Sequence, residues 1–404
     1  MPRTLHVVLL VSLAASCGGD PTAAVDAASP DRATTDSRAD TATLDAPALE
    51  AGGADSWQVD GGADLLTADL PPPDLPAPPG CIQGAFQPYF GNFHAHTSYS
   101  DGVQTPDDAF QYARDVAKLD IMVVTDHLEQ LYLVPPADRY GSCKTAATAQ
   151  TSATFLASCG FEYGSGFNLF LASTGHNNVF FSPSLFPAIQ LDFHDFYKTL
   201  VACATCVGQF NHPGDEPYQH WSNFEYHSDA DDRITLFELN SSAAWDLFFK
   251  ALDAGWHVSP MYNQDNHSAN WGTANDRRSG VFLSQLDGTA LRAAMLDRRT
   301  FATYDKNAVV KVMADTVCWM GSVLTNTASV TLSVEATDAD AADTFSSITI
   351  YGKAKMQLAT SSCGSTNPCS ATFTIQATQS PYAVARVEQD DGDFLVAAPV
   401  WLAP

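Results

Sequence analysis

Histidines and carboxylates occur in short runs, each close after an apolar stretch of the chain. His94 and His96 follow the first stretch, and because side chains alternate along a strand, both imidazoles point the same way. A later run repeats this spacing of two with Asp265 and His267. Imidazole nitrogens and carboxylate oxygens that converge on one point bind divalent metal ions. These runs therefore predict metal-assisted chemistry.

Further residues of the same types follow other apolar stretches, which gives six histidines and three acids at comparable positions. A lone histidine is more often structural than a metal ligand, but a structural role does not explain so many residues at consistent places. The candidate metal ligands are His94, His96, Asp101, His127, Glu162, His176, His212, Asp265 and His267.

The elements that must position these residues alternate between strands and helices. The clearest helix begins after Thr105, which can cap it, with Pro106 as its first residue and Asp108 in its first turn. Strands that alternate with helices pair in parallel, so the sequence predicts an α/β fold, either an open sheet or a barrel. Ligands gather at the carboxyl ends of such strands. Strands are expected at 89–93, 121–125, 178–181, 207–211, 234–239 and 258–263.

The pattern changes at about residue 306. Short strands joined by short turns then predict an antiparallel module, a small β-sandwich. These strands are expected at 309–313, 330–336, 347–351, 371–375 and 382–387.

The order of the ligand motifs resembles that of the PHP superfamily, which is named after DNA polymerases and histidinol phosphatase. The resemblance covers about residues 88–402. It is carried by His94-Ala95-His96 with Ser100-Asp101-Gly102, by Thr125-Asp126-His127, Glu162 and His212-Pro213, and by Asp265-Asn266-His267. Four further segments resemble a branch of this superfamily that includes carbaryl hydrolase-like enzymes. They are Gly175-His176-Asn177-Asn178-Val179, Arg298-Arg299-Thr300-Phe301-Ala302-Thr303, Met320-Gly321-Ser322 and Ala398-Pro399-Val400-Trp401.

The resemblance implies a fold and a ligand scheme. The expected fold is a distorted PHP-type barrel of seven βα units over residues 84–305, followed by the β-sandwich-like domain over 306–404. Two or three divalent ions are implied, and mixed nitrogen and oxygen ligands suit Zn, Mn or Fe. Gln264 departs from the family, which commonly has serine there. The implied ligand sets are His94, His96, Glu162 and Asp265 for one ion, a bridging Glu162 with His176 and His212 for a second, and Asp101, His127 and His267 for a third.

Two catalytic residues are expected beside the ligands. Clustered divalent ions lower the pKa of a bound water to near neutrality, so a metal-bound hydroxide is the expected nucleophile. Asp126, like Asn211, borders the ligands and can orient an imidazole. Arg277, with Arg278 beside it, can grip an anionic substrate, unless both arginines belong to a solvated loop. Glu238 could have a structural role rather than a role in the chemistry.

The sequence therefore predicts a metal-dependent hydrolase of small-molecule esters, with phosphoric esters favoured. The alternatives are a carboxylic or carbamic ester hydrolase of the same fold and a non-catalytic metal- or ligand-binding lipoprotein. With 46 acidic against 20 basic residues, the chain has a formal net charge of −26. Such a chain repels phosphate backbones at long range, so we expect no nucleic acid polymer as a partner and disfavour a polymerase-type exonuclease.

The amino terminus predicts export. Arg3 precedes an apolar run over 5–13 that is too short to span a bilayer, and residues 1–16 together resemble a signal peptide. Small residues then lead to Cys17 as in a bacterial lipobox, although Ala14 stands where leucine is usual. A lipid on Cys17 would attach the protein to a membrane, most simply at the outer membrane or cell surface; otherwise the protein is periplasmic or secreted. Residues 17–83 are acidic and rich in Ala, Asp and Pro, which predicts a disordered linker.

Export changes the interpretation of the cysteines. Removing Cys17 from the nine cysteines leaves eight, and an even number in an oxidising compartment predicts disulfides. Cys143–Cys159 and Cys363–Cys369 are plausible near pairs. For Cys203 and Cys206, a structural bridge is favoured over a redox or zinc pair.

Overall fold

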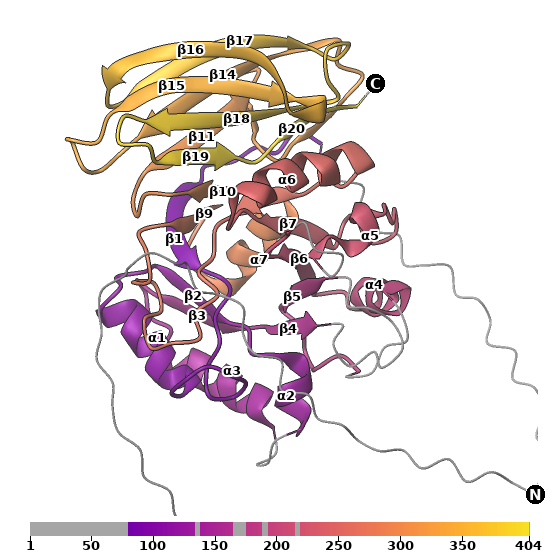
Figure 1. Cartoon of the computed structure of the whole chain (residues 1–404), viewed down its shortest axis with the longest axis vertical. Helices are drawn as coiled ribbons and strands as arrows, with labels where there is room; N and C mark the ends of the chain where they lie inside the picture. The colour runs from indigo at the N-terminus through magenta and orange to yellow at the C-terminus, as the bar shows by residue number, and fades with distance from the viewer. Residues whose placement is uncertain (1–79, 134–137, 165–174, 188–192, 215–218, 404) are drawn as a thin grey trace, which may run out of the picture. The chain divides into compact units, whose positions relative to one another are not determined.

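The computed structural model describes residues 80–133, 138–164, 175–187, 193–214 and 219–403. The expected export signal, Cys17 and residues 17–79 of the expected linker lie outside these ranges. The described chain is a mixed α/β structure, with helices around the strands of its earlier part and strands dominating its last third (Figure 1). None of the helices in the described ranges has both the length and the apolar character that a bilayer span requires.

Two sheets carry the region of the candidate ligands. Pairing is parallel from β1 to β3 and from β6 to β8, as the sequence predicts. It is antiparallel between β9 and β1 and on both sides of β5, where the expectation of parallel strands is wrong. One sheet contains β9 (Arg278–Leu283), β1 (Gln87–Asn92), β2 (Ile121–Val124) and β3 (Leu156–Cys159), and the other contains β4 (Phe161–Gly164), β5 (His176–Phe180), β6 (Val207–Asn211), β7 (Ile234–Glu238) and β8 (Ser259–Met261).

The chain crosses between these sheets at Gly160, the single residue that separates β3 from β4. A Cβ at this position would lie 2.5 Å from the carbonyl oxygen of Val179, so a side chain cannot be accommodated without movement of the backbone. Two isolated parallel bridges also join the sheets, Ala95 with Asn266 and His127 with Glu162. The segments that carry the candidate ligands are therefore tied together by main-chain pairing. Seven βα units in a closed barrel stay a prediction.

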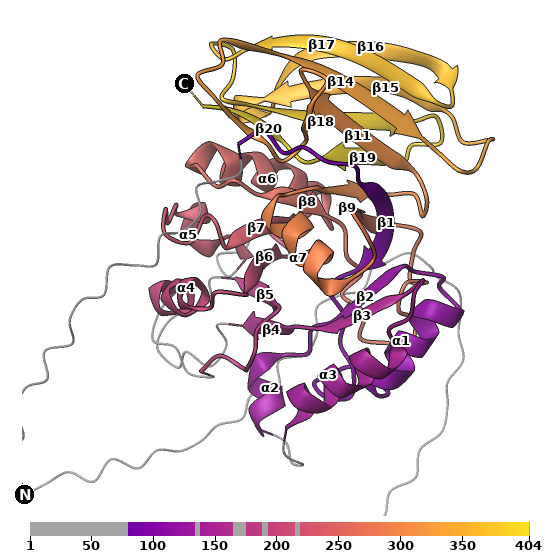
Figure 2. The same cartoon turned by 180° about the vertical axis from the view of Figure 1, so that it is seen from behind.

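Helices flank both sheets. α1 (Pro106–Asp115) begins as predicted, with a reciprocal capping box between Thr105 and Asp108, and it buries Ala109, Phe110 and Ala113. The other helices are α2 (Leu128–Leu133), α3 (Arg139–Gln150), α4 (Phe193–Ala202), α5 (Trp221–Phe224), α6 (Ser242–Ala254) and α7 (Gly288–Leu296). α7 packs against β9, β6 and β7 and is seen best from behind (Figure 2).

The last third of the chain is built almost entirely from antiparallel strands. The five strands predicted here are confirmed, and each end lies within two residues of its predicted position. They are β11 (Val309–Ala314), β14 (Ser329–Thr337), β15 (Phe345–Gly352), β17 (Cys369–Gln376) and β18 (Tyr382–Gln389). The further strands are β10 (Thr300–Thr303), β12 (Cys318–Trp319), β13 (Val323–Thr325), β16 (Met356–Thr366), β19 (Phe394–Ala397) and β20 (Val400–Ala403).

β10 links these strands to the first sheet, because it pairs with β9 on one side and with β19 on the other. One continuous sheet thus runs from the ligand-bearing strands into the carboxyl-terminal ones. The domain boundary expected between residues 305 and 306 and the sandwich assignment stay predictions.

Four disulfides join the eight cysteines that remain without Cys17. The near pairs Cys143–Cys159 and Cys363–Cys369 are confirmed, with Cα atoms 6.1 and 5.5 Å apart, and Cys203 pairs with Cys206. The fourth disulfide, Cys81–Cys318, joins residues 237 positions apart. It fastens the first described residues to the β11–β12 region.

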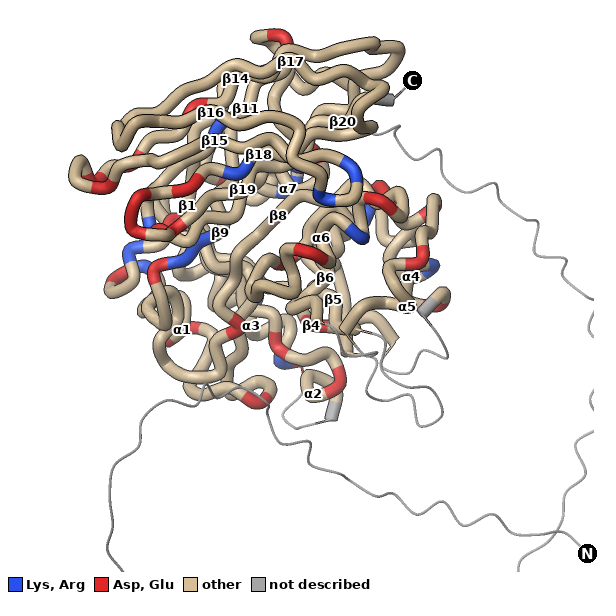
Figure 3. Tube along the Cα trace, turned by 45° about the horizontal axis from the view of Figure 1, so that its top comes forward, with Lys and Arg blue, Asp and Glu red and all other residues tan. Residues whose placement is uncertain are grey.

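Charged residues are unevenly placed along the described chain. Figure 3 shows acidic positions gathered on the loops at one end of β15, β18 and β19, whereas the long strands themselves carry few charges.

Candidate metal centre

The nine candidate ligands converge on one place, and we refer to them together as the metal centre. His94 and His96 follow β1, His127 follows β2, and Glu162 lies on β4. His176 opens β5, His212 follows β6, and Asp265 and His267 follow β8. Their ligand atoms form three groups, within each of which all atoms lie within 4.8 Å of one another. The groups are His94, His96 and Asp265; Glu162, His176 and His212; and His96, Asp101, His127 and His267.

The first group is tightly convergent, with His94 and His96 fully buried and the Asp265 side chain 33% exposed. The Nε2 atoms of His94 and His96 are 3.2 Å apart. Asp265 Oδ1 lies 3.3 Å from the first of these nitrogens and 3.1 Å from the second. Tetrahedral ligands that each lie about 2.1 Å from one ion are separated by roughly 3.4 Å. These three atoms therefore have the spacing of ligands that share a cation.

Glu162 lies at the middle of the metal centre and is 1% exposed. Its two oxygens face five imidazoles between them. Oε1 lies 3.4 Å from His94 Nε2 and 3.1 Å from both His176 Nδ1 and His212 Nε2. Oε2 lies 3.3 Å from His96 Nε2 and 3.1 Å from His127 Nδ1. This is the arrangement of a carboxylate that can bridge two ions.

The third group is more open to solvent. Asp101 Oδ1 lies 3.3 Å from His267 Nε2, and Asp101 Oδ2 lies 3.6 Å from His127 Nε2. The Asp101 and His267 side chains are 43% and 39% exposed. An ion held here would be the most accessible to solvent.

The charges of the metal centre are strongly coupled. Burial disfavours the charged form of Glu162, but His94, His176 and His127 hold its pKa well below the usual range. Burial also opposes the protonation of His96, yet Asp265 and Glu162 raise its pKa to about 10. Without an ion, imidazolium and carboxylate charges attract one another here. Each such proton occupies a lone pair that a metal would use, so metal binding must release protons.

Two buried atoms in the metal centre, His127 Nδ1 and Asp265 Oδ1, have the close ion-pair contacts given above but no well-aligned hydrogen bond among the described residues. A buried polar atom without such a bond is costly unless something else satisfies it. Nitrogen and oxygen donors that converge in this way fit borderline divalent cations such as Zn, Mn or Fe. The residues present therefore suit divalent metal ions.

Two of the candidate ligands have left-handed backbone conformations. His212 has φ +30° and Asp265 has φ +49°. Such conformations are uncommon for residues with a Cβ and concentrate at functional sites, where the surrounding structure holds them. Here they turn the two side chains toward Glu162 and His94.

Glu238 supports the metal centre, a role that the sequence did not reveal. It is fully buried at the end of β7, with Oε1 3.2 Å from His94 Nδ1, and its Oε2 accepts a hydrogen bond of 2.6 Å from the His212 backbone nitrogen. The contact leaves Nε2 of His94 directed at the metal centre. The one available signal was its position at the end of a strand.

Asp126 does not touch an imidazole. It accepts hydrogen bonds of 2.7 Å from both the backbone nitrogen and the hydroxyl of Thr97, and one of 2.5 Å from the Ser100 hydroxyl. Ser100 Oγ in turn lies 3.3 Å from His96 Nδ1. Asp126 thus orients His96 through the loop that it holds, whereas Asn211 acts directly by donating to Glu162 Oε1 at 2.9 Å.

The two arginines have different environments. Arg278 is buried and donates to backbone carbonyls at Gly272, Asn275 and Arg277, so the expectation that it grips substrate is wrong. Arg277 is half-buried, donates to the Tyr262 hydroxyl at 2.9 Å and lies 3.9 Å from the centre of the Tyr304 ring. Its role toward a substrate stays a prediction.

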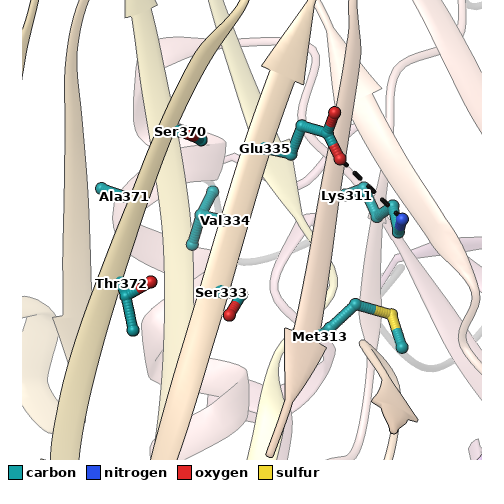
Figure 4. A pocket seen from close by; sticks show the side chains of 8 residues that line it. All are labelled: Lys311, Met313, Ser333, Val334, Glu335, Ser370, Ala371 and Thr372. Carbon is teal, nitrogen blue, oxygen red and sulfur yellow. Dashed lines mark ion pairs between the residues drawn. The ribbon is translucent and has the colours of Figure 1, made fainter. Parts of the chain in front are cut away.

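The four-stranded sheet carries a surface hollow that is unrelated to this chemistry. The side chains drawn in Figure 4 include the Lys311–Glu335 ion pair at 3.8 Å. None of the eight lining residues is a histidine, cysteine or aspartate.

Comparisons with known proteins give structural likenesses only. No protein-family model matches the chain, and no curated protein matches it. A two-domain protein containing a predicted PHP-like metal-dependent phosphoesterase from Bacteroides vulgatus is 17% identical, with a TM-score of 0.44 over 76% of this chain and 93% of that one. Endonuclease Q from Pyrococcus furiosus, and an endonuclease Q complex with a 27-mer duplex that contains an abasic lesion, are each 14% identical, with TM-scores of 0.34. Both alignments cover 52% of this chain and 56% of endonuclease Q. The carbaryl hydrolase-like branch stays a prediction.

The endonuclease Q structures correct one expectation. The sequence predicts no nucleic acid polymer among the partners of this chain, yet one of these similar structures holds a DNA duplex. The exclusion depended on a net charge of −26 averaged over all 404 residues. Bound divalent ions are the largest local charges in a metal site and can reverse the local sign, so net charge does not support that exclusion.

Proposed function

We propose that this chain is a metal-dependent hydrolase that cleaves phosphoric esters. The observation that carries the proposal is Glu162, a buried carboxylate with five imidazoles within 3.4 Å of its oxygens. When bound, divalent ions supply Lewis acidity, lower the pKa of water and stabilise the negative charge that develops on the ester.

The residues of the chain divide the remaining tasks. Glu162 and Asp265 provide the negative charge that offsets the cations, and the imidazoles provide neutral donors. Glu238 and Asn211 fix the orientation of His94 and Glu162. Arg277 is the proposed contact for an anionic part of the substrate, because a guanidinium matches phosphate geometry. Phosphoesters are favoured because several cation positions close together can act on both the attacking and the leaving oxygen.

Metal analysis and a substrate panel test this proposal. Wild-type protein should contain at least two divalent ions per chain and hydrolyse aryl phosphate monoesters or diesters faster than aryl acetates or carbamates. Glu162→Gln should lose both metal and activity, since the amide cannot bridge two cations. Glu335→Gln, the same charge change in the distant surface hollow, should keep both.

The panel separates the alternatives. Faster cleavage of carboxylic or carbamic esters would replace the proposed substrate class while keeping a hydrolase. Bound metal with no hydrolysis of any ester would favour a non-catalytic binding protein. Full metal content and activity in Glu162→Gln would disprove the proposed centre.

Export is proposed on separate grounds, namely the signal-like sequence over residues 1–16 and the four disulfides. Disulfides persist mainly in oxidising compartments. Amino-terminal sequencing of the mature protein from cell fractions tests it, and an uncleaved Met1 in the cytosolic fraction would contradict it.

A further inference from the structure

A second group of possible metal ligands lies at the surface beside α4 and α5, two helices on the same side of the molecule in both Figure 1 and Figure 2. His194 is the second residue of α4, and Glu225 and His227 follow α5. One ligand atom from each of the three lies within 4.8 Å of the other two. The group contains none of the residues of the metal centre.

The two imidazoles of this group are already in contact. The ring centres of His194 and His227 are 4.6 Å apart, and the rings meet edge to face. Tyr197, which is buried and lies on the same helix as His194, packs its ring against His227 with centres 4.7 Å apart. This packing holds His227, whereas His194 and Glu225 are exposed and free to adjust. Ligands of one tetrahedral ion are separated by roughly 3.4 Å, so small movements of exposed side chains would let the group share an ion.

The backbone that leads to the second and third ligands is held in an unusual conformation. The four residues of α5, Trp221–Phe224, all have positive φ, between 44° and 65°. Trp221 is buried, and its indole donates to Asn177 Oδ1 at 2.9 Å. The carbonyl of Phe224 accepts a hydrogen bond of 3.0 Å from the Trp256 indole. A left-handed turn of residues with a Cβ persists only where the surroundings hold it. The two ligands after the turn therefore start from a fixed backbone, as a metal site requires.

The charge around the two rings favours a metal cation over protons. Burial, and then the nearby His194, lower the pKa of His227, and Glu225 and Asp229 oppose this shift without cancelling it. The His227 imidazole is therefore neutral at neutral pH, and the neutral form is the one that binds metal. A divalent ion is attracted by the Glu225 carboxylate and places no proton on either ring.

We propose that His194, Glu225 and His227 bind a zinc ion that is separate from the metal centre. Two imidazole nitrogens and one carboxylate oxygen are a donor set that zinc takes in proteins, and three protein ligands leave a fourth position for water. Calcium and magnesium prefer oxygen ligands throughout, so they fit this group less well. The ion would join the first turn of α4 to the segment that follows α5. It would therefore stabilise the packing of these two elements.

The zinc content and thermal stability of the full chain test the proposal. Wild-type protein dialysed against zinc should hold one more ion per chain than His227→Gln and, separately, one more than Glu225→Gln, in which an exposed side chain keeps nearly its shape. At a zinc concentration about a hundred times the Kd, both variants should unfold on the order of 4 °C below wild type. That difference should vanish after chelator treatment, because it comes from the ion. Ester hydrolysis should be the same in all three proteins.

Two further comparisons make the result specific. Asp229→Asn removes an exposed carboxylate two positions after His227 that is not a proposed ligand, and it should keep the ion. The difference of one ion should also persist between Glu162→Gln and Glu162→Gln combined with His227→Gln, so the test does not depend on the proposed function. The proposal is overturned if wild-type protein and both ligand variants hold equal zinc, if the difference in midpoint survives chelation, or if Asp229→Asn loses the ion as well.

Discussion

Glu238 Oε1 lies 3.2 Å from Nδ1 of His94, on the side of the ring opposite the nitrogen that faces the metal centre. The two residues are 144 positions apart in the chain. A carboxylate in this place fixes the tautomer and the orientation of a metal-binding imidazole and makes it a better ligand.

Glu238→Gln should therefore weaken metal binding although Glu238 itself is not a ligand. Losing such a supporting carboxylate typically costs about 10–100-fold in metal affinity or activity. Competition with a chromogenic chelator measures the affinity, with Glu335→Gln as the control of equal charge change. Unchanged affinity and unchanged hydrolysis would show that Glu238 is only structural.

The metal-free protein should lose stability as the pH rises. The pKa of His96 is about 10 when folded, whereas an unfolded histidine titrates at about 6.5. A raised pKa contributes stability that is fully present below about pH 6.5 and is lost as the pH rises through the folded value. The thermal midpoint of chelator-treated protein should fall between about pH 6.5 and 10. His96→Gln should reduce this slope, and so should metal, which keeps the imidazole neutral throughout. An equal slope in all three samples would contradict the explanation.

Asp126→Asn should destabilise the loop that carries His96. The substitution places an amide among donors from Thr97 and Ser100, and disturbed buried hydrogen bonds cost about 1–3 kcal/mol. Urea unfolding measures this loss, and the turnover number should fall because His96 is less well held. Wild-type stability with low turnover would instead mean that Asp126 acts in the chemistry itself.

Arg277→Met should affect anionic substrates alone. The substitution keeps much of the side-chain bulk against the Tyr304 ring but removes the charge. The KM for an aryl phosphate should rise by about tenfold, the loss expected for one charge-assisted hydrogen bond, while that for an aryl acetate stays the same. Equal effects on both esters would assign Arg277 to packing against Tyr262 and Tyr304.

The mature, unreduced protein should contain four disulfides. Alkylation after denaturation without reductant should label none of the eight cysteines from Cys81 to Cys369, and peptide mapping should recover Cys81 linked to Cys318. Labelling at all eight would contradict the pairing. Cys203→Ser combined with Cys206→Ser serves as the matched variant that removes one short-range disulfide only.

The candidate ligands could be predicted because each belongs to a recognisable local sequence pattern. His94 and His96 lie two positions apart after a strand, and so do Asp265 and His267. Glu238 belongs to no such pattern, because it is a single carboxylate at the end of an apolar strand. Its role depends on its contact with His94, which lies 144 positions earlier in the chain. The Cys81–Cys318 disulfide, across 237 positions, escapes spacing arguments for the same reason.

Some strands of the structure are not predicted by the sequence pattern, for a different reason. β16 spans Met356–Thr366, and seven of its eleven residues are exposed, so its sequence lacks the alternation of apolar and polar residues that predicts a half-buried strand. β10 has four residues and is buried throughout, which gives no periodicity to detect. The antiparallel direction of β5 and β9 depends on which strands lie beside them, and local sequence does not contain that information.

The pairing of β10 on both sides limits how the chain can be shortened. A chain ending at Asp305 would keep Thr300–Thr303 paired with β9 but would remove β19 from the other side. The unpaired backbone groups would then form an open sheet edge, which is a template for strand addition from another molecule. Truncation at this point should therefore yield protein that self-associates, and the carboxyl-terminal strands act as a protective cover for the sheet that carries the metal centre.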